Sequence, residues 1–112
     1  MNASARFAEV GRLLAQDEEI RTVAEQVVGV LEGQDAGHLV RVAADADERD
    51  GFYQQLWDQV VEPLRHDAAS TLDMWRMSME GVVIDHLIAL WATEDGHDWR
   101  SRLRGLLALQ PV

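Results

Sequence analysis

Residues 72–91 read Leu-Asp-Met-Trp-Arg-Met-Ser-Met-Glu-Gly-Val-Val-Ile-Asp-His-Leu-Ile-Ala-Leu-Trp, and this stretch decides the fold. On a helix of about 100° per residue, its apolar side chains form two stripes that cover most of the surface. A surface helix carries a single apolar stripe, whereas a helix that is apolar nearly all round is buried. We therefore expect a long helix over about residues 70–92 in the middle of a bundle, covered by its own chain or by a second subunit.

A third stripe of this helix carries small or polar residues. They are Ser78, Gly81, Val82, Asp85 and Ala89. Glycine in a helix interior costs about 1 kcal/mol relative to alanine, and the close approach of another helix backbone would offset that cost. We therefore predict the tightest helix contact along this stripe. The predicted subunit interface consists of Ser78, Gly81, Asp85, Ala89 and Trp91.

Asp85 and His86 interrupt the apolar run. A buried carboxylate needs a partner, which an Arg or a backbone N–H of a facing helix would supply. Consecutive helical residues point about 100° apart, so Asp85 and His86 do not face each other. We expect His86 to be a core or interface histidine. Asp85 is the first functional candidate, because a carboxylate inside an apolar run has a perturbed pKa or a specific partner.

The composition limits the possible functions. The chain has 112 residues, with 10 basic and 20 acidic residues and a net charge of −10. This charge argues against binding to nucleic acid or to an anionic membrane. There is no Cys, so disulfide and thiol chemistry are excluded. With no signal peptide or apolar span of about 20 residues, we expect one cytoplasmic domain over residues 1–112. All basic residues are Arg, as in proteins of GC-rich bacteria.

The rest of the chain has apolar residues at helical spacing and no strand alternation. We predict an all-α, single-domain bundle of five to six helices. The expected N-caps are Ser4, Asp17, Asp35, Asp67 or Ser70, and Asp95. Gly33 occupies the position of the glycine that follows a helix. The acidic residues 45–51 are expected to form a solvated connection before a helix that begins near Phe52 and is kinked by Pro63.

The last helix carries three of the ten Arg residues and no acid after residue 98. They are Arg100, Arg102 and Arg104. We expect this basic helix to dock on acidic neighbours in the chain or in a partner subunit.

Sequence motifs of catalysis are missing: there is no P-loop, nucleophile elbow, HExxH or dinucleotide fingerprint. We therefore name no catalytic residue, cofactor or metal ligand. One metal pattern resembles that of HD-type phosphohydrolases, which are also all-helical. It would comprise His38, His66, Asp67, and Asp85 or Asp98. This resemblance implies a metal-dependent hydrolase, and Asp67 as a helix N-cap is the competing interpretation.

Aromatic and Met residues allow a ligand-binding alternative. An apolar pocket would be lined by Trp57, Trp75, Met79 and His86, whereas core or interface packing is the simpler interpretation. Residues 51–109, with the segment from Phe52 to Leu64 followed by one long helix, resemble the dimerising, effector-binding region of TetR-type regulators. The resemblance implies ligand sensing. Residues 1–50 show no DNA-reading helix-turn-helix, so it does not imply repression.

Three functional hypotheses follow. The first is a small acidic accessory, adaptor or regulatory protein without catalysis, which forms a homodimer and binds another protein. The second is the ligand-sensing module, which would bind a small apolar ligand. The third is a nucleic-acid mimic that blocks a DNA-binding partner through Asp45, Asp47, Glu48 and Asp50.

Overall fold

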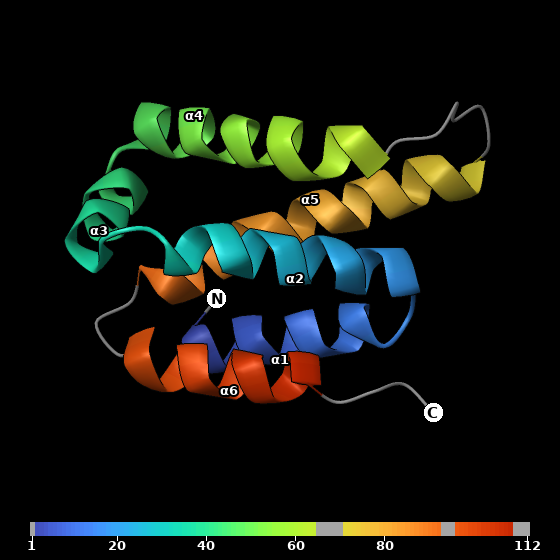
Figure 1. Cartoon of the computed structure of the whole chain (residues 1–112), viewed down its shortest axis with the longest axis horizontal. Coiled ribbons are helices and arrows are strands. Elements are labelled where there is room, and N and C mark those ends of the chain that lie inside the picture. The colour runs from blue at the N-terminus through green and yellow to red at the C-terminus, as the bar shows by residue number, and fades with distance from the viewer. Residues whose placement is uncertain (1, 65–70, 93–95, 109–112) are drawn as a thin grey trace.

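The computed structural model describes residues 2–64, 71–92 and 96–108 and is an all-α bundle with six α-helices in that part of the chain (Figure 1). The helices are α1 (Ala3–Leu14), α2 (Glu18–Glu32), α3 (Ala36–Ala44), α4 (Ala46–Leu56), α5 (Thr71–Trp91) and α6 (Gly96–Ala108). A π-turn, η1 (Trp57–Val61), and a 3₁₀ turn, η2 (Glu62–Leu64), extend α4. The prediction of an all-α bundle is confirmed. No helix in the described residues is long and apolar enough to cross a membrane.

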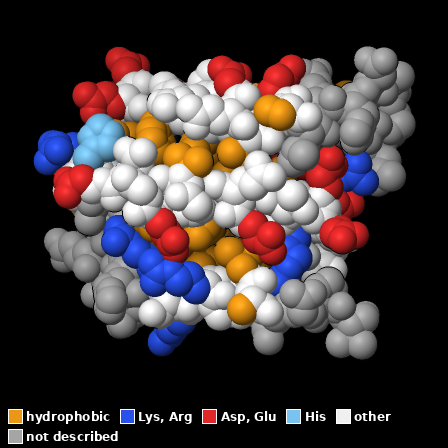
Figure 2. Space-filling model, in the orientation of Figure 1, with side chains coloured by type: hydrophobic (Ala, Val, Ile, Leu, Met, Phe, Trp, Pro, Cys, Tyr) orange, Lys and Arg blue, Asp and Glu red, His pale blue; other side chains and the backbone are white. Residues whose placement is uncertain are grey.

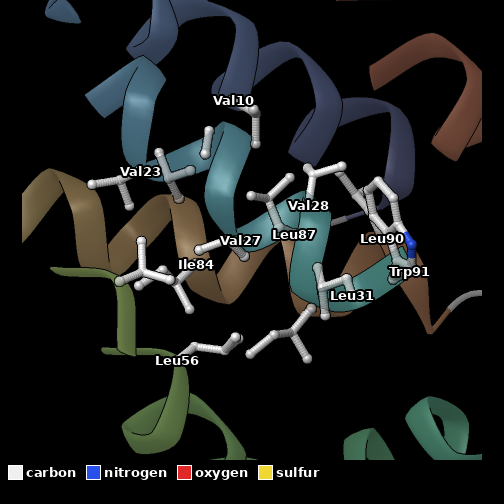
Figure 3. Packing of buried hydrophobic residues seen from close by; sticks show 14 of the residues in the cluster. Val10, Val23, Val27, Val28, Leu31, Leu56, Ile84, Leu87, Leu90 and Trp91 are labelled. Atoms are coloured by element: carbon white, nitrogen blue, oxygen red, sulfur yellow. The ribbon is translucent and has the colours of Figure 1, made fainter. Parts of the chain in front are cut away.

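The long helix α5 is the centre of the bundle and contacts α1, α2, α3, α4 and α6. Its second half is buried by its own chain. The fully or nearly fully buried residues there are Val83, Ile84, Leu87, Ile88, Leu90 and Trp91. They pack against Val10 of α1, several valines of α2 and Leu56 of α4 (Figure 3). Each such side chain contributes roughly 1.5–3 kcal/mol. Met74 and Trp75, near the start of α5, are the exposed exceptions, at 68% and 38%.

The last helix packs against α5 and α1 (Figure 1), and polar contacts join it to α2. The rings of Phe7 and Trp99 pack with their centroids 5.5 Å apart. Arg104 pairs with Glu32 at the end of α2, and Arg21 of α2 donates to the Leu106 carbonyl over 3.2 Å. The basic helix therefore docks on an acidic neighbour within its own chain.

Carboxylate N-caps define two helix starts as predicted. Asp17 accepts hydrogen bonds from the backbone N–H groups of Glu19 and Ile20, and Asp35 accepts one from His38. The predicted Ser4 cap is wrong, because Asn2 accepts from Ala5 and begins α1 two residues earlier. Asn is as effective an N-cap as Ser.

Gly33 ends α2 in a right-handed conformation, with φ of −79°. The left-handed geometry typical of a glycine after a helix is therefore not used there. The predicted caps Asp67, Ser70 and Asp95 lie outside the described residues.

Residues 46–51 of the acidic stretch 45–51 are helical, so the prediction of a solvated connection there is wrong. Asp45 ends α3 and caps α4, accepting from the N–H groups of Asp47 and Glu48 over 2.9 and 3.1 Å. Acidic residues in a first turn also meet the positive end of the helix dipole. The acidic residues therefore favour the start of a helix here, and their side chains lie exposed along α4 (Figure 2).

The end of α4 departs from regular geometry just before Pro63. Proline has no N–H to donate to the residue four positions earlier, and the chain passes through the π-turn and the 3₁₀ turn. Leu56, Val60 and Val61 are all buried, a pattern that the wider π-turn accommodates. The predicted disruption at Pro63 is confirmed.

Candidate functional site

A surface groove of about 630 Å³ lies between α4 and α5. Its lining residues are Asp50 and Tyr53 from α4, and Ser78, Gly81, Val82, Asp85 and His86 from α5. We call it the α4–α5 groove. The small, polar stripe predicted from the sequence forms its α5 wall.

The floor of the groove is closely packed at Gly81. A Cβ atom there would lie 2.5 Å from the Tyr53 hydroxyl and 3.6 Å from the Trp57 ring. The sequence predicted a close contact on this stripe with another helix backbone. The contact exists, but the neighbours are two side chains of the same chain. Tyr53 and Trp57 stack with a 6.3 Å centroid distance and an interplanar angle of 21°, which holds the tyrosine over the glycine.

A third helix contributes to the site through Arg6 of α1. The Nη1 atom of Arg6 lies 3.0 Å from Nδ1 of His86 and 3.9 Å from the Asp85 carboxylate. Arg is always protonated, so it must be the donor to Nδ1. His86 is therefore neutral, with its proton on Nε2. The expected Arg partner of Asp85 thus comes from a facing helix, although half of the Asp85 side chain is exposed.

Two polar groups of the groove, His86 and Tyr53, have shifted pKa values. Burial lowers the pKa of His86, and the cation of Arg6 lowers it further, against the opposing effect of Asp85. Burial raises the pKa of Tyr53, and the Asp85 charge adds to that effect. At neutral pH the site therefore presents two neutral donors, the His86 N–H and the Tyr53 hydroxyl, beside the carboxylates of Asp50 and Asp85.

Glu80 of α5 is a buried carboxylate that was not singled out from the sequence. It is 3% exposed, and its Oε1 atom has no hydrogen-bond partner in the described part of the chain. One turn away, Arg76 bonds Asp17 over 3.2 Å and Glu19 over 3.0 Å. Burial, and then the charge of Glu19, raise the pKa of Glu80 to about 7. Its position within an apolar run was the available signal.

The other predicted interface residues lie deeper. Ala89 is half-buried, and Trp91 is 1% exposed inside its own chain. Trp91 is therefore inaccessible to a second subunit in this structure, whereas Ser78, Gly81 and Asp85 reach the groove. The homodimer itself stays a prediction.

The four residues of the predicted ligand pocket occupy different environments. His86 is the member of this set that lines the α4–α5 groove. Trp57 and Met79 are half-buried against the core, and Trp75 is exposed. The aromatic and Met side chains therefore serve mainly as packing in the described structure, and the apolar-ligand interpretation stays a prediction.

The predicted metal pattern is only partly described. His38 lines a separate groove of about 350 Å³ between α3 and α4, together with Arg41 and Phe52 among others, whereas Asp85 lies in the α4–α5 groove. His66 and Asp67 fall outside the described residues, as does the side chain of Asp98. Within residues 2–64, 71–92 and 96–108, no three His, Asp or Glu side chains are grouped to hold a metal ion.

No protein-family model, curated protein or solved structure matches this chain. The resemblances to TetR-type regulators and to HD-type phosphohydrolases therefore stay predictions, and the functional argument depends on the geometry of the groove.

Proposed function

We propose that this chain is a small interaction protein, an accessory or regulatory subunit without catalysis of its own, which binds a partner protein at the α4–α5 groove. The observation that carries the proposal is the Arg6–His86 hydrogen bond. In this bond, Arg6 of a third helix, α1, holds the buried His86 ring in place in the wall of an open groove. Polar groups that are held in place at a concave surface are typical of binding sites.

The state of His86 favours binding over acid–base chemistry. Its Nδ1 atom already accepts a hydrogen bond from a permanent cation, and its Nε2 atom carries the proton. Protonation would require the loss of the Arg6 bond, and the pKa of the ring is lowered. The ring is therefore a weak general base, but a well-positioned hydrogen-bond donor.

The charge of the chain supports a basic protein partner. The net charge is −10. Exposed acidic side chains lie along α4 (Figure 2), and one of them, Asp50, lines the groove. Such a surface attracts a positively charged partner and accelerates its association. A second copy of the chain is the alternative occupant of the same face, as the small stripe predicts.

A groove-blocking substitution tests the proposal. Ser78 is exposed and lines the groove, so Ser78→Trp should fill it without disturbing the core. Gln55→Trp, in the groove between α3 and α4, is the matched control. A partner captured from cell extract and then purified should bind Ser78→Trp at least tenfold more weakly than the control variant. Equal affinity for both variants would reject the α4–α5 groove as the binding site.

A further inference from the structure

We infer that the α4–α5 groove takes an arginine side chain from a basic peptide segment, and that His86 donates a hydrogen bond to a backbone carbonyl of the same segment. The inference rests on the proposed function for the location of binding. It adds the chemistry of the occupant, which follows from three observations on the groove.

The first observation is a pair of carboxylates on opposite walls. Asp50 projects from α4 and Asp85 from α5, and both line the groove. The Asp85 side chain is 51% exposed, and its contact with Arg6 is long, at 3.9 Å. Its oxygens therefore keep acceptor capacity for an incoming donor. A guanidinium, with five N–H donors in one plane, can bond carboxylates on two sides, which a compact ammonium does less well.

The second observation is an aromatic ring between these carboxylates and the floor. Tyr53 is stacked on Trp57 and lies over Gly81. Planar guanidinium groups stack on aromatic faces and gain cation–π attraction there. The Tyr53 hydroxyl already fills the space beside Gly81, so the guanidinium would lie on the ring and not against the glycine.

The third observation is a hydrogen-bond donor that is free to meet an incoming acceptor. His86 is 8% exposed, and its Nδ1 atom is occupied by Arg6. The remaining Nε2–H of this buried ring makes no hydrogen bond to any residue that the structure describes. A free polyamine or a metal ion offers no acceptor, whereas a peptide offers one at every carbonyl. The combination of carboxylates with an unpaired donor therefore selects an arginine within a peptide.

The arginines of α6 are a less suitable source for this side chain. Arg104 pairs with Glu32, Arg102 lies 4.9 Å from the Trp99 ring centre, and Arg100 donates to the Trp91 carbonyl over 2.9 Å. A second copy of this chain would have to give up such a contact to fill the groove with an α6 arginine, and it would bring the same net charge of −10 to an acidic surface. A different, basic protein is thus the favoured source.

Four small probes test the inference by amide NMR titration of the full chain. They are acetyl-Gly-Arg-Gly-amide, the same peptide with lysine, the same peptide with citrulline, and agmatine, which has the guanidinium but no peptide carbonyl. The arginine peptide should shift the amides of Ser78, Gly81, Val82 and Asp85 and bind at least fivefold more tightly than each other probe. Asp50→Asn and Asp85→Asn should each weaken it about tenfold, and Asp47→Asn, an exposed acid of α4 outside the groove, should not.

Defined results would overturn the inference. If the citrulline peptide binds as tightly as the arginine peptide, the groove does not recognise the guanidinium. If agmatine binds as tightly, the contact of His86 with a peptide carbonyl does not contribute. Self-association of the chain that the arginine peptide reverses would make a second copy the occupant. If no probe shifts the groove while Ser78→Trp still weakens partner binding, the inference fails and the proposed function stands. If the probes bind the groove but Ser78→Trp leaves partner binding unchanged, the proposed function fails instead.

Discussion

Arg6 donates from Nη1 to Nδ1 of His86 over 3.0 Å, and this bond joins the first helix to the central one. The two residues are 80 positions apart in the chain, so the contact depends on the complete bundle. It fixes the tautomer of a buried ring at the candidate site. The orientation of His86 in the groove depends on this bond, which substitution of Arg6 tests directly.

Arg6→Met should raise the pKa of His86, because the arginine cation contributes to lowering it. In the native protein this pKa lies below the unfolded value, so His86 contributes stability that is lost as pH falls from about 6.5 through the folded pKa. Arg6→Met should therefore lose less unfolding free energy than the native chain as the pH falls below about 6.5. Ring ¹⁵N shifts should report the Nε2–H tautomer in the native chain, and Arg12→Met is the control. An Nδ1–H tautomer in the native chain would contradict the assignment.

Glu80 predicts an opposite pH dependence. Its pKa is raised from 4.5 to about 7, so its contribution is fully present below about pH 4.5 and lost as pH rises through 7. Glu80→Gln should remove that loss, which amounts to as much as about 3 kcal/mol. Urea unfolding at pH 5 and pH 8 measures it, with the exposed Glu48→Gln as control. A variant with the pH profile of the native chain would show that Glu80 is already ionised at pH 5.

Gly81→Ala should destabilise the chain, because its Cβ would meet the Tyr53 hydroxyl at 2.5 Å. Gly29 has open space around it in the interior of α2, so Gly29→Ala should stabilise by about 1 kcal/mol. We expect the two variants to differ by about 1–3 kcal/mol in unfolding free energy. Tyr53→Phe removes the clashing oxygen and should largely restore Gly81→Ala. If the effects of Gly81→Ala and Tyr53→Phe on the unfolding free energy simply add, the Tyr53 side chain moves aside without cost when a Cβ is introduced at residue 81.

The burial of α5 by its own chain predicts a local pattern of stability. Ile84→Ala should cost about 2–5 kcal/mol, whereas Met74→Ala, at an exposed site, should change stability by less than about 0.5 kcal/mol. Both values should be independent of protein concentration. A midpoint that rises with concentration would show that a second subunit covers part of the helix.

The sequence was sufficient for the central helix and for the breaks in the chain. Apolar residues on most of the surface of 72–91 predict burial, which holds for the second half of α5 but not for Met74 and Trp75. Asp17 and Asp35 are local capping signals, and Pro63 cannot continue a helix. Residues 45–51 were misjudged because their side chains are all solvated, whereas their backbone follows the cap at Asp45 and the helix dipole. Ser4 and Asn2 are both good caps, so composition alone does not separate them.

Of the candidate site, only the wall that α5 provides was predictable from the sequence. Ser78, Gly81 and Asp85 share a stripe, and helical periodicity alone reveals it. Tyr53 lines the groove from α4, and Arg6 of α1 contacts His86 and Asp85. The positions of both depend on how the bundle packs. For Glu80, its position within an apolar run was a signal in the sequence, but the groups that surround it were not predictable. Its burial follows from the position of α2, which also brings Glu19 beside it.

The most direct test of the central claim is site-specific photocrosslinking to the partner. A benzoylphenylalanine replaces Ser78 in the α4–α5 groove or, in a parallel sample, Gln55 in the groove between α3 and α4. We predict a crosslink from the first position, to a peptide that contains arginine, and none from the second. A crosslink from Gln55 alone, or equal yields from both positions, would contradict the assignment of the α4–α5 groove as the binding surface.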